Sequence, residues 1–467
     1  MINYFNSKKL SNDKYLITND FGEYAFIDSV CYNKLVTDSL DQNDINYDVL
    51  VDRGFVINTP LESFIQERYY QIQNMKSYCM TGTSLHIFAV TNACNLDCIY
   101  CQAHSKSSKL DGMMSAETGK KAIELAMQSP NKNLTFEFQG GEPLLNFETV
   151  KEMILHSKNL NSNCSKNIEY TIVTNLTKID DNILEFLSAN NVQICTSLDG
   201  PREVHNYNRP FRFNASGSYD NVINKIRFIR EKGINVNAIQ TTTKKSLKYY
   251  KEIVDEYISI GMNNVFIRPL TPLGLADTSW ETVGYSSKEF LEFYKNMFDY
   301  IMEINKKGYR FVETHALYFL KKILHGYSYN YMELRSPCGA SLGQMSYYYT
   351  GDVYTCDEGR MMSEMGDFSF RLGNVYDNSY SDFVESPICK AICKASIVES
   401  LPKCNDCAYQ PYCGTCPVVN YASTRDLYSN NIKDYRCSAY KGIMDLLFEI
   451  LERDDEDEMD IMFSWLE

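Results

Sequence analysis

The chain has 467 residues, of which 44% are hydrophobic, and its 60 Asp and Glu against 46 Lys and Arg give a formal net charge of −14. This length allows roughly two to three domains, and the acidic balance argues against a nucleic-acid partner, whose phosphates are contacted mainly by Lys and Arg. The opening stretch MINYFNSKKLSNDKYLI is polar and charged throughout, so we expect neither a signal peptide nor a membrane span, and a cytoplasmic protein.

Residues 1–80 are predicted to form a separate unit. Apolar runs at 15–18 and 24–27 are joined by a loop that contains Gly22, which predicts a hairpin. Helical patterns near 29–39 and 45–51 precede a third apolar run at 55–57, and this order suits a small winged-helix-like module. The eleven acidic against seven basic residues of this unit argue against DNA as its ligand.

Three cysteines, Cys94, Cys98 and Cys101, follow an apolar run at 85–90 in the sequence CNLDCIYC. A cubane iron–sulfur cluster normally takes four thiolates, so a group of three leaves one iron open to a ligand that is not protein. A zinc knuckle is the other interpretation of a short cysteine group, but zinc usually takes four N or S ligands in paired blocks. The spacing therefore favours an iron–sulfur site with one open iron.

Short β-branched runs alternate with longer amphipathic segments as far as about residue 270. Such alternation, repeated about six times, predicts a parallel sheet, either open or curled into part of a barrel. Ligands of such sheets bind at the carboxyl ends of the strands. The expected strands are 85–90, 134–138, 168–174, 192–197, 236–242 and 264–268, and the expected helices lie near 116–127, 147–160, 183–189, 219–231 and 248–260.

Glycine and a carboxylate follow the second expected strand, in the sequence QGGEP. Gly140 and Gly141 allow the backbone to come close to a ligand, and Glu142 offers a carboxylate to a ligand ammonium group. A plain Gly-Pro turn is the alternative for this segment taken alone. Its position at a strand end, one strand after the cysteine loop, favours a ligand site.

Polar side chains also end the third and fourth strands. Asn175 and Ser197 can bond ribose hydroxyls or a carboxylate, and Arg209 offers a bidentate partner for a carboxylate. For Asp199 and His205, in SLDGPREVH, ordinary turn chemistry is an equal alternative.

Beyond residue 330 the alternation stops and cysteines return. Cys338 and Cys356 flank a predicted hairpin in SYYYTGDVYTC, with its turn at Gly351 and Asp352. A CxxCxxxxxCxxC pattern comes next, followed after twenty intervening residues by one further cysteine, and a zinc ribbon is the alternative for it. This pattern comprises Cys404, Cys407, Cys413, Cys416 and Cys437.

The CxxxCxxC spacing resembles the signature of the radical S-adenosylmethionine (SAM) enzymes. The GGEP, SLDGP and later cysteine motifs are similar to those of radical SAM peptide maturases with a SPASM domain. The order of the motifs is most similar to the B-type maturases of His-Xaa-Ser peptide systems, which are related to anaerobic sulfatase-maturating enzymes. The resemblance implies an α/β fold with a partial (β/α)6 barrel at 81–330, a SPASM domain at 331–450 and an acidic tail at 451–467.

The resemblance also implies three [4Fe–4S] clusters and SAM. Cys94, Cys98 and Cys101 would hold the SAM-binding cluster, and two auxiliary clusters would be held by the seven later thiolates. Cys404, Cys407, Cys413 and Cys437 would bind one of these, and Cys338, Cys356 and Cys416 the other. The implied SAM contacts are Tyr100, Gly140, Gly141, Glu142, Asn175, Ser197 and Arg209.

Two departures from the family pattern concern the auxiliary clusters. Two residues, where the pattern has three, separate Cys413 from Cys416, so the assignment of Cys416 stays open. Seven thiolates are one short of eight, so the cluster at Cys338 has either an open iron or a fourth ligand from Cys389 or Cys393.

The activity implied is reductive cleavage of SAM to a 5′-deoxyadenosyl radical, followed by hydrogen abstraction from a residue of a ribosomally made peptide. The product would be a crosslink or a related modification. The implied partners are the precursor peptide and an electron donor such as flavodoxin or ferredoxin. The module at 1–80 would recognise the leader of the peptide by strand addition or cap the barrel.

Asp357, directly after Cys356, matches the aspartate that acts as the base in sulfatase-maturating relatives, with an exposed turn residue as the equal alternative and Glu358 as a substitute. A sulfatase-type maturase that makes formylglycine is the alternative function. From another class, the alternatives are a non-enzymatic iron–sulfur electron carrier and a zinc-ribbon interaction protein. The apolar end at 461–466 would dock onto the protein itself or onto a partner.

Overall fold

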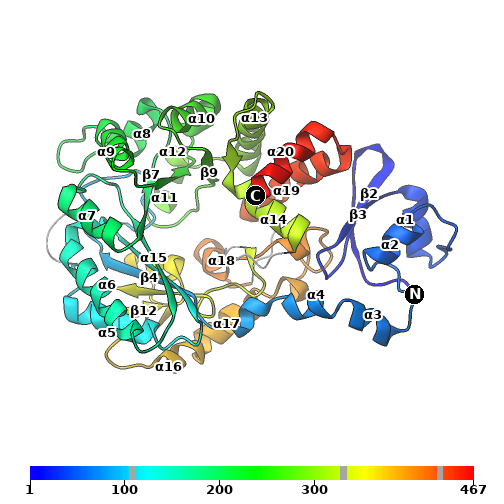
Figure 1. Ribbon diagram of the computed structural model, residues 1–467, viewed down its shortest axis with the longest axis horizontal. Coiled ribbons are helices and arrows are strands. Elements are labelled where there is room, and N and C mark those ends of the chain that lie inside the picture. The colour runs from blue at the N-terminus through cyan, green and yellow to red at the C-terminus, as the bar shows by residue number, and fades with distance from the viewer. Residues whose placement is uncertain (105–111, 327–333, 429–434) are drawn as a thin grey trace.

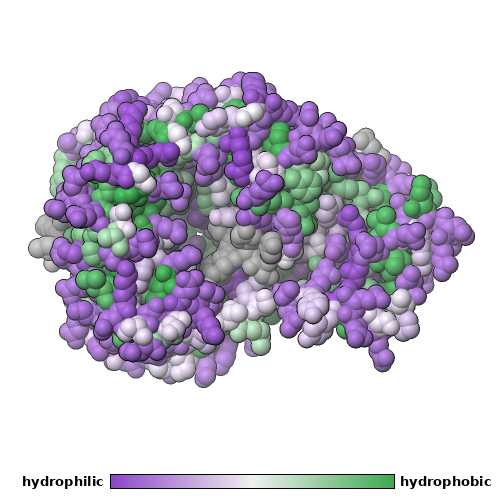
Figure 2. Space-filling model, in the orientation of Figure 1, coloured by the Kyte–Doolittle hydropathy of each residue, from purple (hydrophilic) through white to green (hydrophobic). Residues whose placement is uncertain are grey.

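The computed structural model describes residues 1–104, 112–326, 334–428 and 435–467. A small N-terminal module lies at one end of the molecule, and a large curved sheet with helices along its outer side lies at the other (Figure 1). The C-terminal helices run between these two parts (Figure 1). The face shown in Figure 2 is mostly hydrophilic, with scattered hydrophobic residues.

The N-terminal module is a three-stranded antiparallel sheet with two helices against it. Strands β2 (Lys14–Thr18) and β3 (Tyr24–Asp28) form the predicted hairpin, and β1 (Asn6–Lys9) pairs with β2. Helices α1 (Ser29–Val36) and α2 (Tyr47–Asp52) match the two predicted helical patterns. The apolar run at 55–57 is not a strand, because it contributes only the isolated bridge between Ile2 and Val56.

This module packs on the C-terminal part of the chain. Thr18 Oγ1 donates a buried hydrogen bond of 2.8 Å to Ala408 O. The ring of Tyr24 lies 5.4 Å, edge to face, from that of Phe448 on α19 (Tyr435–Arg453). Helices α3 (Leu61–Glu67) and α4 (Tyr69–Asn74) connect the module to the large sheet.

The large sheet has ten strands in the order β10-β9-β8-β7-β6-β5-β4-β11-β12-β13. Its strands β4 to β10 run parallel to their neighbours, so all six predicted strands are confirmed as one parallel sheet. Their bounds are β4 (Leu85–Thr91), β5 (Asn133–Gly140), β6 (Asn167–Val173), β7 (Val192–Ser197), β8 (Val236–Thr241), β9 (Asn264–Arg268) and β10 (Val312–Glu313).

Helices cover the outer face of this sheet, where the strands bury alternate side chains. Leu134, Phe136 and Phe138 of β5 are buried in the main core, whereas Thr135 and Glu137 between them are only half-buried. This alternation is the period-two pattern of a strand whose two faces meet different surroundings. The covering helices are α5 (Ala116–Ala126), α6 (Phe147–Asn161), α7 (Asp181–Ala189), α8 (Arg202–Asn208), α9 (Tyr219–Glu231) and α10 (Tyr250–Ser259).

Residues from beyond position 330 extend the same sheet. Strand β11 (Gln344–Tyr348) pairs parallel with β4, and β12 (Asp352–Tyr354) and β13 (Arg371–Asn374) follow antiparallel. The predicted hairpin at 346–356 is therefore present, and Gly351 at its turn has φ +89°. The predicted C-terminal domain thus begins inside the sheet of the barrel.

The remaining helices follow β9 in the chain. In the part of the chain that the structure describes, no helix is long and apolar enough to cross a membrane. These helices are α11 (Leu275–Thr278), α12 (Trp280–Val283), α13 (Ser287–Lys306), α14 (Thr314–His325), α15 (Asp357–Glu364), α16 (Tyr380–Val384), α17 (Pro387–Ala395), α18 (Pro417–Thr424), α19 and α20 (Glu456–Leu466).

Candidate functional site

The cysteines of CNLDCIYC lie in the loop that follows β4, with their thiols close enough to influence one another. Burial raises the pKa of Cys98 to about 12, although the guanidinium of Arg209 opposes this shift. N–H donors face two of the sulfurs: Leu96 N lies 3.4 Å from Cys94 Sγ, and Arg209 Nη1 lies 3.9 Å from Cys98 Sγ. Such donors stabilise negative charge on sulfur, so the loop suits thiolate ligation of an iron–sulfur cluster.

Gly140 and Gly141 hold the end of β5 against the cysteine loop. Gly141 N donates a hydrogen bond of 2.8 Å to Thr91 O, and the next amide donates to Ala93 O at the same distance. A Cβ at Gly140 would lie 2.1 Å from Thr91 O, and one at Gly141 would lie 2.2 Å from Ala93 O. No larger residue fits at either position, so both glycines serve this contact within the chain, which the motif alone does not indicate.

Glu142 is fully buried and links the ends of β5 and β6. Its carboxylate accepts hydrogen bonds from Thr174 Oγ1 at 2.6 Å, Asn175 N at 2.8 Å and Leu144 N at 3.0 Å. Burial raises the pKa of this carboxyl to about 7, against the opposing effect of these donors. Asn175 Nδ2 lies 3.8 Å from Cys94 Sγ, so two residues predicted to contact SAM stand beside the cysteine loop.

A second buried carboxylate, Asp199, gathers the other predicted SAM contacts. It accepts hydrogen bonds from Tyr100 OH at 2.8 and 3.0 Å, from Asn208 Nδ2 at 2.9 Å and from Arg209 Nε at 3.1 Å. The Arg209 guanidinium also lies over the Tyr100 ring, 5.2 Å from its centre. Asp199 therefore orients both Tyr100 and Arg209 next to Cys98.

The roles of Asp199 and Ser197 differ in the structure. Asp199 had an ordinary turn as its equal interpretation, because Asp-Gly-Pro is common turn chemistry. The signal that identifies it is its place just past the end of β7 and ten residues before Arg209 in the sequence. Ser197 is the last residue of β7 and is paired in register with Ile239 of β8. His205 is fully buried, and its Nε2 lies 3.1 Å from Ser218 Oγ.

Three of the later cysteines meet in one small hydrophobic cluster. Cys338, Cys356 and Cys416 are buried there together with Leu273 and other apolar side chains. Burial raises the pKa of each thiol, and the nearby carboxylate of Glu358 raises it further. The structure therefore brings together the three thiols that the resemblance assigned to one cluster.

Helix α17 carries the two other cysteines considered for that cluster. Its Cys389 and Cys393 are hydrogen-bonded to each other. This bond raises the pKa of Cys393, and the nearby thiol of Cys338 raises it further. The end of the same helix contacts Cys338 directly, because Cys338 N donates to Ser396 Oγ at 2.9 Å. Of these two cysteines, Cys393 is the one whose pKa is raised by a thiol of that cluster, Cys338.

The four cysteines that the resemblance assigned to the other auxiliary cluster line a single cavity. Lys403, Arg436 and Lys441 also contribute to its wall. Within the described ranges, no group of three or more His, Cys, Asp or Glu side chains is arranged to hold one metal ion. An all-thiolate set around a shared cavity suits an iron–sulfur cluster, which is wider than one ion. The cavity cysteines are Cys404, Cys407, Cys413 and Cys437.

Asp357, the predicted base, is the first residue of α15. Its Oδ1 accepts a hydrogen bond of 2.8 Å from Nε of Arg360, which is itself only 1% exposed. The side chain of Asp357 is 14% exposed, so it is not the exposed turn residue of the alternative interpretation.

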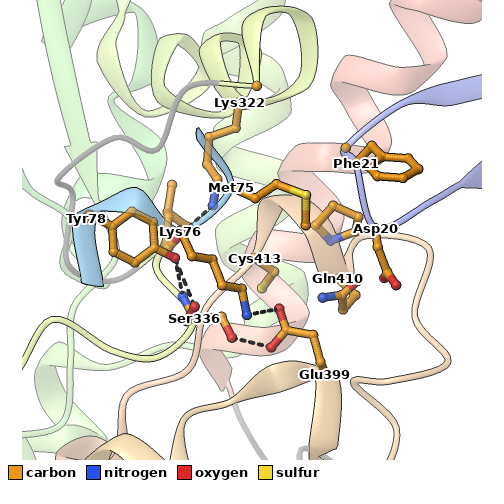
Figure 3. Close-up of a pocket in the computed structure, with 14 residues that line it drawn as sticks. Asp20, Phe21, Met75, Lys76, Tyr78, Lys322, Ser336, Glu399, Gln410 and Cys413 are labelled. Carbon is orange, nitrogen blue, oxygen red and sulfur yellow. Dashed lines mark hydrogen bonds and ion pairs between the residues drawn. The ribbon is translucent and has the colours of Figure 1, made fainter. Parts of the chain in front are cut away.

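A further cavity of about 210 Å³ lies between the N-terminal module, α14 and the cysteine-rich segment. Figure 3 shows Lys76 paired with Glu399 at 2.6 Å, with Cys413 at the back of the cavity. Lys322 from α14 points into it and donates to Leu334 O, and burial lowers the pKa of this lysine to about 8 (Figure 3). The cavity therefore reaches one of the cysteines of the second thiol group.

A parallel sheet with a three-thiol loop after its first strand, and buried polar groups at the next strand ends, defines the class of the radical SAM proteins. The Radical SAM superfamily matches residues 88–245. An uncharacterised protein, MJ0907 of Methanocaldococcus jannaschii, is 31% identical over 222 residues, which are 48% of this chain and 70% of that protein. The chain belongs to the radical SAM superfamily and is a radical SAM enzyme.

Longer similarities extend through the C-terminal part. The cysteine-type anaerobic sulfatase-maturating enzyme of Clostridium perfringens is 26% identical over 384 residues, 79% of this chain and 97% of that enzyme. The structure of anSMEcpe with bound AdoMet and a Cp18Cys peptide has TM-score 0.66 and 23% identity, over 79% of this chain and 98% of the other. That of Streptococcus suis SuiB bound to precursor peptide SuiA has TM-score 0.56 and 15% identity, over 94% and 99%. These two structures share the fold.

Proposed function

We propose that this enzyme is a peptide maturase that abstracts hydrogen from a residue of a ribosomally made precursor and so gives it a crosslink or a related modification. The observation that carries the proposal is the two later groups of thiols, the first with Cys338 and the second with Cys413, which are gathered by a segment that continues the barrel sheet through β11. Auxiliary clusters at these positions would lie beside the inner face of the sheet, where they could accept an electron from the substrate. An enzyme acting only on SAM has no such requirement.

The residues present fit a SAM-binding cluster and SAM itself. Cys94, Cys98 and Cys101 would hold the cluster, which when bound with SAM supplies a carbon-centred radical for hydrogen abstraction. Glu142 offers a carboxylate to the amino group, and Asp199 presents Arg209 to the carboxylate. Tyr100, Gly140, Gly141, Asn175 and Ser197 complete the proposed contacts.

The seven later thiols would hold two further [4Fe–4S] clusters, and we assign them as the resemblance does. Cys338, Cys356 and Cys416 hold one of them, and Cys393 is the favoured fourth ligand because it neighbours Cys338. The second is held by Cys404, Cys407, Cys413 and Cys437. Flavodoxin or ferredoxin would supply the reducing electrons.

The substrate would be a leader-bearing peptide that reaches the inner face of the sheet. The N-terminal module supports this, because a small antiparallel sheet with an edge strand can bind an extended leader by strand addition. The likeness to SuiB, whose structure holds a precursor peptide, spans this module as well.

The test combines cofactor analysis with a search for the substrate. Anaerobically reconstituted protein is analysed for iron and for 5′-deoxyadenosine formed from SAM and reductant, and it is co-expressed with short peptides encoded beside its gene, whose masses are then measured. About twelve irons, nucleoside formation and a peptide with a changed mass support the proposal. Fewer than about eight irons per chain, or peptides of unchanged mass and unchanged chirality, would contradict it.

A sulfatase-type maturase is the second candidate, favoured by Asp357 directly after Cys356 and by the similarity to the C. perfringens enzyme. Such an enzyme would convert a Cys or Ser in a sulfatase-derived peptide to formylglycine. Incubation with a Cys-containing sulfatase peptide decides between the two functions, because only this candidate predicts the mass change of formylglycine. On this candidate, Asp357→Ala removes the base and abolishes that change.

A further inference from the structure

Glu137 is an acidic residue on the inner face of the sheet, close to the proposed SAM site. It belongs to the half-buried row of β5, opposite the row that packs under the helices. It is paired in register with Ile87 of β4 and Thr171 of β6, neither of which carries charge. Two residues further on, Gln139 leads directly into Gly140, so Glu137 lies just below the strand end that meets the cysteine loop.

Charged and ionisable groups from three other elements face Glu137. Burial raises the pKa of its carboxyl to about 7, the neighbouring carboxylate of Asp357 on α15 adds to this shift, and Arg268 at the end of β9 opposes it. Burial, and to a smaller extent Glu137, raise the pKa of Cys195 on β7. On α15, Asp357 is paired with Arg360, and the adjacent Glu358 lies near the thiols of Cys338, Cys356 and Cys416. Ionisable side chains from four separate elements, β5, β7, β9 and α15, therefore lie within electrostatic reach of one another.

Polar atoms without partners surround this spot. In the described part of the chain, Gln139 Nε2, Ser346 Oγ and Tyr348 OH are buried and make no hydrogen bond. Ser346 is paired in register with Ile87, which is in turn the neighbour of Glu137, and Tyr348 is paired with Ala89 next to Gln139. Buried polar atoms are almost always satisfied, so this face is built to receive a polar ligand.

The two carboxyl groups differ in what holds them. Asp357 is fixed by the nearly inaccessible guanidinium of Arg360, 2.8 Å from its Oδ1. For Glu137, Arg268 is the group that opposes the effect of burial and of the neighbouring negative charge. A pair of carboxyl groups in unlike surroundings is the usual basis for dividing acid and base roles.

We propose that Glu137 is the group that accepts the proton released by the substrate, with Asp357 as its fixed, charged neighbour. This inference rests on the proposed function and deepens it, because it moves the role of base from the residue next to Cys356 to a residue of the barrel. The substrate is then a peptide segment laid along the inner face between β5 and α15.

The step balances as a two-electron oxidation of the peptide. One hydrogen atom leaves a C–H bond with the nucleoside radical that SAM supplies. The electron left on the substrate as the new bond forms at that carbon would need a one-electron oxidant, which an oxidised iron–sulfur cluster held by the later cysteines would supply. The proton of the attacking or adjacent heteroatom moves to the carboxylate of Glu137, which later returns it to water.

Glu137→Gln, Glu137→Asp and Asp357→Asn are the variants that test this role in the reconstituted enzyme. Glu169→Gln is the matched control, because Glu169 lies at the start of the neighbouring strand β6 and is exposed. Glu137→Gln is expected to lower the rate of peptide modification by about 100-fold or more while 5′-deoxyadenosine formation without peptide stays unchanged. Glu137→Asp is expected to recover part of the rate, and the control to keep all of it.

The pH profile separates a proton acceptor from a structural residue. Modification by the wild type is expected to rise as Glu137 ionises near pH 7, and Asp357→Asn is expected to move that rise to lower pH because a neighbouring negative charge is gone. An unchanged profile in Asp357→Asn, or a Glu137→Gln enzyme as fast as the wild type, would overturn the proposal.

An infrared measurement without any peptide keeps this inference apart from the proposed function. Difference spectra of the reconstituted enzyme between about pH 5 and about pH 9 are expected to show carboxyl bands that titrate near neutrality, from Glu142 and Glu313 as well as from Glu137, and the Glu137 component is the one missing from Glu137→Gln. If no peptide is modified but the Glu137 component is present, the proposed function fails and the proton-holding site stands. If Glu137 is ionised throughout, the inference fails whatever the substrate is.

Discussion

Asp199, the acidic residue of the SLDGP segment, shows how a single residue can organise a cofactor site. Its carboxylate fixes Tyr100 and Arg209 at once, and both side chains lie beside Cys98. Arg209 is otherwise nearly buried, at 9% exposure, so its charge depends on this partner. The orientation of Arg209 toward a ligand carboxylate is therefore set by Asp199.

Asp199→Asn is expected to destabilise the protein by about 3–5 kcal/mol, because it leaves the buried charge of Arg209 uncompensated. Asp97→Asn is the matched control, since Asp97 pairs with Arg212 at 3.3 Å but is 55% exposed, and a loss below about 1 kcal/mol is expected. Anaerobic urea denaturation of both variants measures the free energies of unfolding. Equal losses of unfolding free energy in the two variants would show that the buried pair of Asp199 and Arg209 stabilises the protein no more than the exposed pair does.

Glu313 makes a prediction about pH. It caps α14 and accepts hydrogen bonds from His315 N, Ala316 N and the hydroxyl of Tyr294, and burial raises its pKa from 4.5 to about 7. Between about pH 4.5 and about pH 7, the folded state therefore keeps a proton on Glu313 that the unfolded state has lost. The contribution of this carboxyl lowers the free energy of unfolding as the pH rises through that range. Glu313→Gln is expected to remove that loss, up to about 3 kcal/mol, in unfolding measurements across this range. Parallel pH curves for wild type and variant would contradict it.

Among the elements, the C-terminal helix settles a question that its sequence left open. Helix α20 docks onto the protein itself, with Trp465 only 2% exposed and its ring 5.7 Å from that of Phe298 on α13. The acidic residues at its start are favourable there, because the N-terminal end of a helix carries partial positive charge.

Trp465→Ala is expected to cost about 3–5 kcal/mol of unfolding free energy, as for other large buried side chains. Phe463→Ala on the same helix removes a side chain that is 47% exposed, and its expected cost is below about 1 kcal/mol. Thermal or urea unfolding compares the two. A tail that served only a partner would give the same small cost for both.

The strands of the barrel could be predicted because each strand shows as a local pattern of residues. Which strands pair with one another could not be predicted in this way. β4 to β9 coincide with the expected runs, and the register of β5 is visible in the alternation of Leu134, Phe136 and Phe138 with polar residues. The pairing of β11 with β4 joins segments more than 250 residues apart, and no period in the sequence identifies such a partner. The same alternation places Glu137 on the inner face, but its charged neighbours come from other strands and needed the structure.

At the scale of the whole molecule, continuity of the sheet explains how the chemistry is assembled. Because β11 and β12 extend the barrel sheet, Cys356 and Asp357 are delivered to the side of the sheet that carries Glu137. The family pattern predicts how the seven later cysteines divide between two clusters. This division stays a prediction, and the structure places the same thiols in two groups. What the spacing could not indicate is that the end of α17 contacts Cys338 through Ser396, since that contact depends on packing.

The two later thiol groups make a prediction about iron that is independent of any substrate. Cys413→Ala is expected to lower the iron content from about twelve to about eight per chain, because one of three four-iron clusters loses a ligand. The same variant is expected to keep 5′-deoxyadenosine formation, since Cys413 belongs to a different cavity from Cys94 and its neighbours.

Cys98→Ala is expected to differ from Cys413→Ala in its effect on 5′-deoxyadenosine formation. It is expected to lose a similar amount of iron together with nucleoside formation, because the open iron that would bind SAM belongs to its cluster. Cys164→Ala is the control for cysteine removal as such, since Cys164 is exposed and has no ligand spacing. Iron, sulfide and zinc analysis of the three variants settles the identity of the metal. Zinc in place of iron in the wild type, lost on Cys413→Ala, would make the second group a zinc ribbon and remove the electron acceptor from the proposed mechanism.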